Sequence, residues 1–204
     1  MAITKHDLEM WEQLKGEVAI PSRPRVLELG LANWYGDVQP PGVEGDEWRT
    51  GDGPFRIARA YYRKLLDYRE IVAIDLNGPA EAHRMDLNFP LPQLPPFHEP
   101  FDIVINTGTS EHVFDQAQLF ESVHNCTRPG GLMVHTVPAV WPEHGFYSYS
   151  ACLFLDLAQA NGYSIIYCCE RMLENARLLM VAMKRLLPAL GDGRFRLPMQ
   201  RRSK

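Results

Sequence analysis

Short segments that are almost continuously apolar alternate along the chain with segments whose apolar side chains recur at helical spacing. The first pattern is typical of buried strands and the second of amphipathic helices. Strands are predicted over residues 25–29, 71–75, 85–87, 101–106, 132–137, 163–169 and 177–185. Helices are predicted over residues 4–18, 55–68, 115–126 and 150–161. The order of these elements indicates strands that are joined mainly through helices.

This alternation predicts an α/β fold, with a Rossmann-like, doubly wound sheet of seven strands. Strands that are apolar throughout suit a mostly parallel sheet, because helices cover both of its faces. The last two strands are separated only by the short polar link 170–176, which leaves no room for a crossover helix. They are therefore expected to pair antiparallel, which gives the sheet an antiparallel edge strand.

The length of 204 residues suits one domain that spans residues 1–204 and buries a core of its own. An N-terminal helix is expected within residues 1–20. Residues 31–54 are rich in Gly, Pro, Asp and Glu and longer than most connections, so they are expected to form a loop and could act as a lid. Residues 188–204 form a basic tail, which is expected to be a solvated end of the chain.

Charge and composition narrow the class of partner. The net charge of −4 argues against a protein that binds nucleic acid through phosphate contacts. No apolar run reaches the roughly 18–20 residues that a membrane span needs, and four cysteines without a C-x-x-C pair suit reduced thiols. We therefore expect a cytoplasmic protein without nucleic acid or membrane partners; the oligomeric state is left open.

Acidic side chains follow two of the predicted strands. Ligands of open α/β sheets bind beyond the carboxyl ends of the strands. Asp75, at the end of the second strand, suits hydrogen bonds to the hydroxyls of a ribose. Asp86, at the third, could accept a hydrogen bond from the amine of adenine. The pair predicts an adenosine ligand, which could belong to a nicotinamide dinucleotide or to S-adenosylmethionine.

Five segments carry a family resemblance. They are VLELG (26–30), VAID (72–75), MDLNFPL (85–91), FDIVINTGTSEHV (101–113) and RPGGLMVHTVP (128–138). In this order, they resemble the successive motifs of class I S-adenosylmethionine-dependent methyltransferases of the small-molecule type, and the resemblance covers about residues 25–185. A nicotinamide cofactor fits less well, because no G-x-G-x-x-G follows the first strand.

The resemblance implies S-adenosylmethionine as cofactor and a set of residues that bind it. The implied set is Glu28, Gly30, Leu31, Ala32 and Asn33 after the first strand, Asp75 and Leu76 after the second, Asp86 and Leu87 after the third, and Asn106 and Thr107 after the fourth. The family's G-x-G turn is degenerate here, because only its first glycine, Gly30, is kept. Ala32 is nearly as small as glycine, and Asn33 tolerates left-handed backbone geometry.

Two histidines are candidates for catalysis. His112 follows the fourth strand, and its ordinary pKa near neutrality suits a general base; alternatively it caps the next helix or packs against the cofactor. His144 lies in the aromatic loop after the fifth strand. The candidate substrate contacts are Trp34, Tyr35, Glu111, Trp141, Phe146 and Tyr147, although some of these aromatic side chains could belong to the core.

The remaining histidines and the acids suggest no metal site. Glu111, His112 and Asp115 could converge, but no established ligand spacing is present and methyl transfer needs no metal. His135 is expected in the core, and His124 on the surface.

Three functions remain open from the sequence. The first is a methyltransferase with a small-molecule acceptor, of the kind that acts in small-molecule biosynthesis. The second is a cyclase or lyase that uses S-adenosylmethionine on the same fold, which a pocket without room for an acceptor would favour. The third is a non-catalytic pseudoenzyme that binds an adenosyl ligand or serves as a scaffold, for which the degenerate turn is the main argument.

Overall fold

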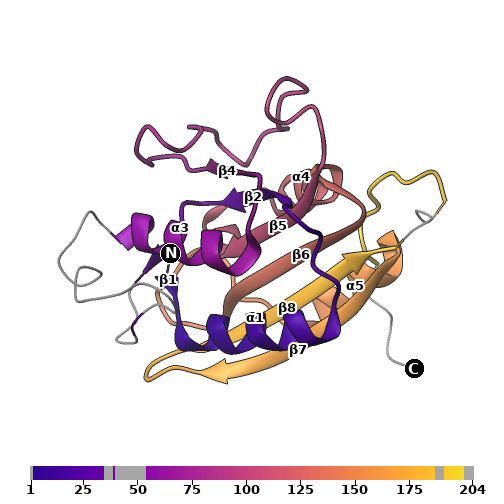
Figure 1. Cartoon of the computed structure of the whole chain (residues 1–204). Coiled ribbons are helices and arrows are strands. Elements are labelled where there is room, and N and C mark those ends of the chain that lie inside the picture. Colours follow the sequence, from indigo (N-terminus) through magenta and orange to yellow (C-terminus); the bar gives the residue numbers. More distant parts are fainter. Residues whose placement is uncertain (1, 35–38, 40–53, 187–190, 200–204) are drawn as a thin grey trace, which may run out of the picture.

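The computed structural model describes residues 2–34, 39, 54–186 and 191–199 (Figure 1). Tyr35 and most of the predicted 31–54 loop lie outside the described residues, as do parts of the basic tail. Among the described residues, no helix is both long and apolar enough to cross a membrane.

The main sheet has six strands in the order β4-β2-β5-β6-β8-β7. Their bounds are β2 (Arg25–Leu29), β4 (Glu70–Ile74), β5 (Phe101–Thr107), β6 (Thr127–Val140), β7 (Tyr163–Met172) and β8 (Arg177–Arg185). The first four strands in this order are mutually parallel. Strand β8 runs antiparallel to β6, and β7 antiparallel to β8, which confirms the predicted antiparallel pair at the edge.

The prediction of seven strands was wrong by one, because residues 85–87 form no strand. The only pairing in this part of the described chain is an isolated bridge between Ile74 and His83. The side chain of Asp86 accepts hydrogen bonds from the backbone N–H of Asn88 at 2.9 Å and from its side-chain amide at 2.7 Å. Such a local turn competes with strand pairing, and it leaves β4 as the edge of the sheet.

A second, two-stranded parallel sheet was not predicted. It joins β1 (Ala2–Ile3) to β3 (Asn33–Trp34). Strands of two residues are too short to produce an apolar pattern of their own. This pairing brings the N-terminus to the turn that follows β2.

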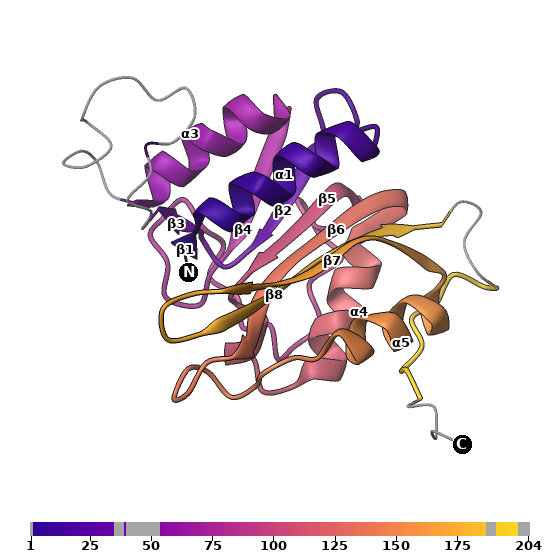
Figure 2. The same ribbon diagram turned by 90° about the horizontal axis from the view of Figure 1, so that it is seen from below.

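Helices cover both faces of the main sheet, as Figure 2 shows. Helices α1 (Lys5–Glu17) and α3 (Pro54–Leu66) lie on one face, and α4 (Gln116–Cys126) and α5 (Ala151–Asn161) on the other. Two separate apolar cores result, one beneath each pair of helices. The helix ends follow sequence signals: Asp115 accepts from the N–H of Gln118 at 2.9 Å, and Gly162 ends α5 with a φ of 68°.

Asp7 and the segment 191–199, near the two ends of the described chain, form hydrogen bonds with the sheet and with α5. Asp7 of α1 is buried and accepts a 2.7 Å hydrogen bond from the hydroxyl of Thr136 in β6. The segment 191–199 is anchored where Asn161 exchanges two hydrogen bonds with the backbone of Arg196, at 2.7 and 2.9 Å. This part of the tail is therefore anchored beside α5, while side chains such as Leu197 and Met199 are exposed.

His124 was expected on the surface but is buried. Its two ring nitrogens form hydrogen bonds, one with the hydroxyl of Tyr163 at 2.7 Å and the other with the carbonyl of Gly193 at 2.8 Å. Both partners lie far along the chain, so the local pattern of α4 gives no sign of them. His135 is fully buried in the core, as expected.

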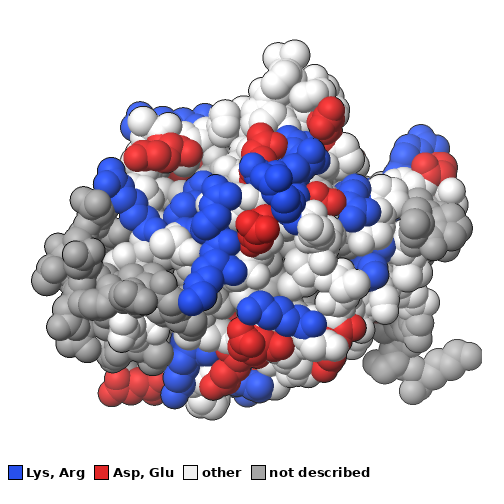
Figure 3. All heavy atoms as spheres, in the orientation of Figure 1, with Lys and Arg blue, Asp and Glu red and all other residues white. Residues whose placement is uncertain are grey.

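The charged side chains of the face in Figure 3 are interspersed. Lys and Arg side chains lie beside Asp and Glu side chains over the described elements of this face. Ion pairs among the described residues include Arg25–Glu70 and Lys15–Glu12, the second at 3.0 Å. The charges on this face are therefore largely balanced locally.

Candidate active site

A cleft of about 300 Å³ lies beyond the carboxyl ends of β2, β4 and β5. The turn after each strand contributes to its walls, and the segment 85–88 closes one side. The lining residues are Gly30, Leu31, Asn33, Ile74, Asp75, Leu76, Asn77, Met85, Asp86, Leu87, Asn88, Gly108, Thr109, His112 and Val113. This is the place where ligands of open α/β sheets bind.

The turn after β2 is held against the turn after β4. Gly30 has a φ of +70°, a conformation that glycine adopts without strain, and its N–H donates to the carbonyl of Ile74 at 2.6 Å. The N–H of Leu31 donates to the Asp75 carboxylate at 3.1 Å. Asp75 is thereby fixed at the cleft by the neighbouring turn.

Glu28 lies behind this turn and does not line the cleft. Its carboxylate accepts from the N–H of Ala32 at 3.0 Å and pairs with Arg59 at 3.4 Å. Burial raises the pKa of Glu28 to about 7, although Arg59 and the hydrogen bond from Ala32 oppose the rise. Ala32 is buried beside it. Both residues support the turn that displays Gly30, Leu31 and Asn33.

Asn106 also supports the site from behind. It is fully buried, and its side-chain oxygen accepts from the N–H groups of Thr109 at 3.3 Å and Ser110 at 3.1 Å. Its amide donates to the Ser110 hydroxyl at 2.9 Å. These bonds shape the turn from β5 into the short helix η1 (Ser110–His112), which carries Glu111 and His112.

A second cavity of about 250 Å³ adjoins the cleft. Most of its walls are apolar. It is lined by Thr4, Thr107, Gly108, Glu111, His112, Thr136, Val137, Pro138, Trp141, His144, Leu173 and Leu178. Gly108 and His112 line both spaces. Thr4, Leu173 and Leu178 were not predicted as site residues, because they reach the cavity from opposite ends of the chain.

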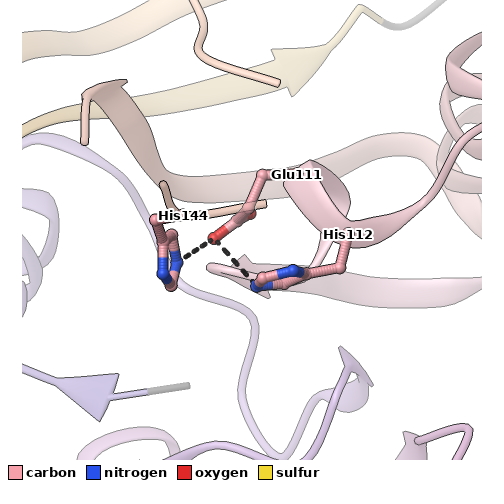
Figure 4. A group of neighbouring side chains, drawn as sticks. All are labelled: Glu111, His112 and His144. Atoms are coloured by element: carbon pink, nitrogen blue, oxygen red, sulfur yellow. Dashed lines mark ion pairs between the residues drawn. The ribbon is translucent and has the colours of Figure 1, made fainter. Parts of the chain in front are cut away.

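Glu111, His112 and His144 form a cluster at this junction (Figure 4). Oε1 of Glu111 lies 3.4 Å from Nε2 of His144 and 3.9 Å from Nε2 of His112. Burial raises the pKa of Glu111 to about 7 and lowers the pKa of both histidines. The ring of Trp141 stacks on His144 with 4.1 Å between the ring centroids.

The loop after β6 holds His144 against Glu111. The N–H of Phe146 donates to the carbonyl of Glu111 at 2.7 Å. Gly145 has a φ of +71°, and a side-chain carbon there would lie 2.8 Å from the same carbonyl oxygen and 2.9 Å from the Glu111 Cγ. Only glycine permits this close approach.

Three predicted substrate contacts line neither cavity. Trp34 is buried, with its ring 5.5 Å from that of Tyr61. Phe146 is 66% exposed and packs on Phe114 at 6.0 Å. The Tyr147 hydroxyl donates to the carbonyl of Phe114 at 2.9 Å. Phe146 and Tyr147 thus contact Phe114, whereas Trp34 belongs to the core. Tyr35 lies outside the described residues.

Comparison with known proteins agrees with this architecture. Residues 51–135 match a family model described as a methyltransferase domain. None of the curated protein sequences compared with the chain matches it.

Several solved structures share the fold at low sequence identity. A 1,6-didemethyltoxoflavin-N1-methyltransferase of Burkholderia thailandensis, with S-adenosylhomocysteine bound, is 13% identical, with a TM-score of 0.56 over 87% of this chain and 76% of that one. The N-methyltransferase NodS of Bradyrhizobium japonicum, in complex with S-adenosylhomocysteine, is 14% identical, with a TM-score of 0.54 over 87% of this chain and 86% of that one. Residues 51–135 therefore resemble a methyltransferase domain, and the chain has the fold of these solved methyltransferases.

Proposed function

We propose that this protein transfers the methyl group of S-adenosylmethionine to a small molecule. The observation that carries the proposal is the junction of two cavities. The cleft beyond β2, β4 and β5 meets the second, mostly apolar cavity at Gly108 and His112. A two-substrate transfer needs such an arrangement, because the two reacting atoms must be held in line and in contact.

The cofactor would occupy the cleft beside Asp75 and Asp86. Asp75 would accept hydrogen bonds from the ribose hydroxyls, and Asp86 would accept from the adenine amine while Leu87 packs on the ring. Gly30, Leu31 and Asn33 would lie along the methionine end. The bound cofactor supplies a methyl carbon on a positively charged sulfur, which is open to attack by a nucleophile.

The acceptor would occupy the second cavity. Val137, Pro138 and Leu178 offer apolar contacts, which suit a molecule with an apolar portion. Its nucleophilic atom would point to the junction, where Glu111, His112 and His144 supply the polar groups. Both histidine pKa values are lowered by burial, so the rings are neutral at pH 7 and able to accept a proton.

The second cavity favours transfer over the two alternative functions. A cyclase or lyase attacks or cleaves the cofactor within itself and needs no separate space for an acceptor. A pseudoenzyme needs no polar cluster at the point where the two spaces meet. The cavity and the cluster together therefore support a reaction between two substrates.

Calorimetric titration with S-adenosylhomocysteine tests the cofactor site. The wild-type chain should bind, and Asp75→Ala should weaken binding about 10–100-fold, as expected for the loss of hydrogen bonds to a charged group. Asp156→Ala, on α5 and away from the cleft, should bind like the wild type. Failure of the folded wild-type chain to bind, or equal affinity in Asp75→Ala, would overturn the proposed site.

A further inference from the structure

Two imidazoles and one carboxylate meet in a geometry that suits a metal ion. One ligand atom from each of Glu111, His112 and His144 lies within 4.8 Å of the other two. Metal bonds of about 2.1 Å at tetrahedral angles place ligand atoms roughly 3.4 Å apart. Glu111 and His144 already have this spacing, at 3.4 Å, and Glu111 and His112 exceed it only slightly, at 3.9 Å.

The carboxylate at the centre of the cluster is buried and incompletely satisfied. Glu111 is 1% exposed, and its Oε2 has no hydrogen-bond partner among the described residues. Burying a carboxylate without full partners is costly, and a cation bound at the other oxygen, Oε1, would offset that cost by neutralising the charge. In Figure 4 the two rings approach the same carboxylate oxygen from either side.

The fold builds this arrangement from segments that are distant in the sequence. His144 reaches Glu111 only because Gly145 packs against that side chain and Phe146 donates to its carbonyl at 2.7 Å. The expectation of no metal site considered Asp115 as the third ligand. Asp115 instead caps α4, and His144 takes its place beside Glu111 and His112.

We propose that Glu111, His112 and His144 bind one divalent cation of the zinc class at the junction of the two cavities. Two imidazoles and a carboxylate suit such borderline metals better than they suit Mg²⁺ or Ca²⁺, which prefer oxygen ligands. Three protein ligands leave a coordination position open, as in catalytic rather than structural zinc sites. That position faces the second cavity, because all three ligands line it.

The role of the cation rests on the proposed function. An acceptor hydroxyl at the open position would lose its proton to water more readily, because the cation stabilises the resulting negative charge. The electron pair of that oxygen then forms a bond to the methyl carbon as the carbon–sulfur bond breaks, and the sulfur keeps the bonding pair. When the cation is bound, His112 and His144 are its ligands, and neither ring takes the proton from the acceptor hydroxyl.

Titration of chelator-treated protein with Co²⁺ tests the site, with visible absorbance and calorimetry as readouts. We expect one Co²⁺ per chain with a tetrahedral spectrum, displaced by Zn²⁺. Glu111→Gln and His144→Ala should each weaken binding at least about a hundredfold, since even residues that only support ligands change affinity 10–100-fold. His98→Ala, an exposed histidine elsewhere, should bind like the wild type.

Two results would overturn the inference. One is the absence of stoichiometric binding by a wild-type chain that still binds S-adenosylhomocysteine, which would leave the cofactor site intact and the cluster metal-free. The other is binding that survives Glu111→Gln but disappears in Cys168→Ser, because Cys168 is an exposed thiol on β7. Thermal melting without metal identifies any variant that has failed to fold.

Discussion

Replacing Glu28 with glutamine should make the stability of the protein less dependent on pH. Glu28 is 2% exposed, and burial raises its pKa from 4.5 to about 7. Each pKa unit corresponds to about 1.4 kcal/mol, so an ionised Glu28 lowers the free energy of unfolding by roughly 3 kcal/mol. Glutamine has nearly the same shape and can still accept the hydrogen bond from Ala32, but it carries no charge to desolvate.

The direction in which stability changes with pH follows from proton binding to Glu28. The folded state holds the Glu28 proton more tightly than the unfolded state, so its contribution is fully present below pH 4.5 and is lost as the pH rises to about 7. Wild type and Glu28→Gln should therefore diverge over this window, with the variant gaining up to roughly 3 kcal/mol relative to the wild type. The ion pair with Arg59 forms only when Glu28 is ionised, and its effect is already contained in the pKa of about 7.

Urea unfolding at intervals from pH 4.5 to 8.5 measures the difference. Other groups that titrate in this range, Glu111 among them, are common to both proteins and drop out of the comparison. A difference in unfolding free energy that stays flat across the window would refute the reasoning, because it would mean that Glu28 is not desolvated in the folded state.

Two further experiments test other contacts. Gly145→Ala should lower stability by at least about 1–2 kcal/mol, the cost of a left-handed alanine, and should also weaken Co²⁺ binding because its side chain meets Glu111. Gly130→Ala is the matched control: it carries the same strain, with a φ of +79°, but touches only a flexible arginine, so its Co²⁺ affinity should not change. A double-mutant cycle of Asp7→Ala and Thr136→Val, followed by urea unfolding, should give a coupling of about 1.5–3 kcal/mol for their buried hydrogen bond; strict additivity would contradict a direct interaction.

The apolar strands and the amphipathic helices could be predicted because their patterns are local. The segment 25–29 is buried throughout as β2, and Gly162 and Asp115 end and begin helices as their residue types suggest. The prediction of a strand over residues 85–87 was wrong. Two apolar residues there flank Asp86, whose side chain accepts a hydrogen bond from the nearby backbone N–H of Asn88 instead of leaving the backbone to pair as a strand. Three residues are too few for periodicity to decide between a strand and a turn.

The candidate site was predictable only where it depends on strand ends. Asp75 faces the cleft because the turns after neighbouring parallel strands share one edge of the sheet, whereas Asp86 reaches the cleft from the segment 85–88, which no strand precedes. The sequence cannot indicate that Glu28 and Asn106 turn inward, since a polar residue at a strand end can face either way. The sequence also cannot indicate that Glu111 contacts His144. That contact depends on the hydrogen bond from Phe146 to the carbonyl of Glu111 and on Gly145, both far along the chain from η1.

The two adjoining spaces draw on different parts of the chain. The described wall of the cleft comes from residues 30–113, whereas the second cavity also takes Thr4, Leu173 and Leu178, and only Gly108 and His112 belong to both. Divergence and recombination can therefore act on them separately. Under the proposed function, exchanging the segments around Thr4 and the β7–β8 hairpin between homologues should change which acceptor is used without changing the affinity for the methyl donor.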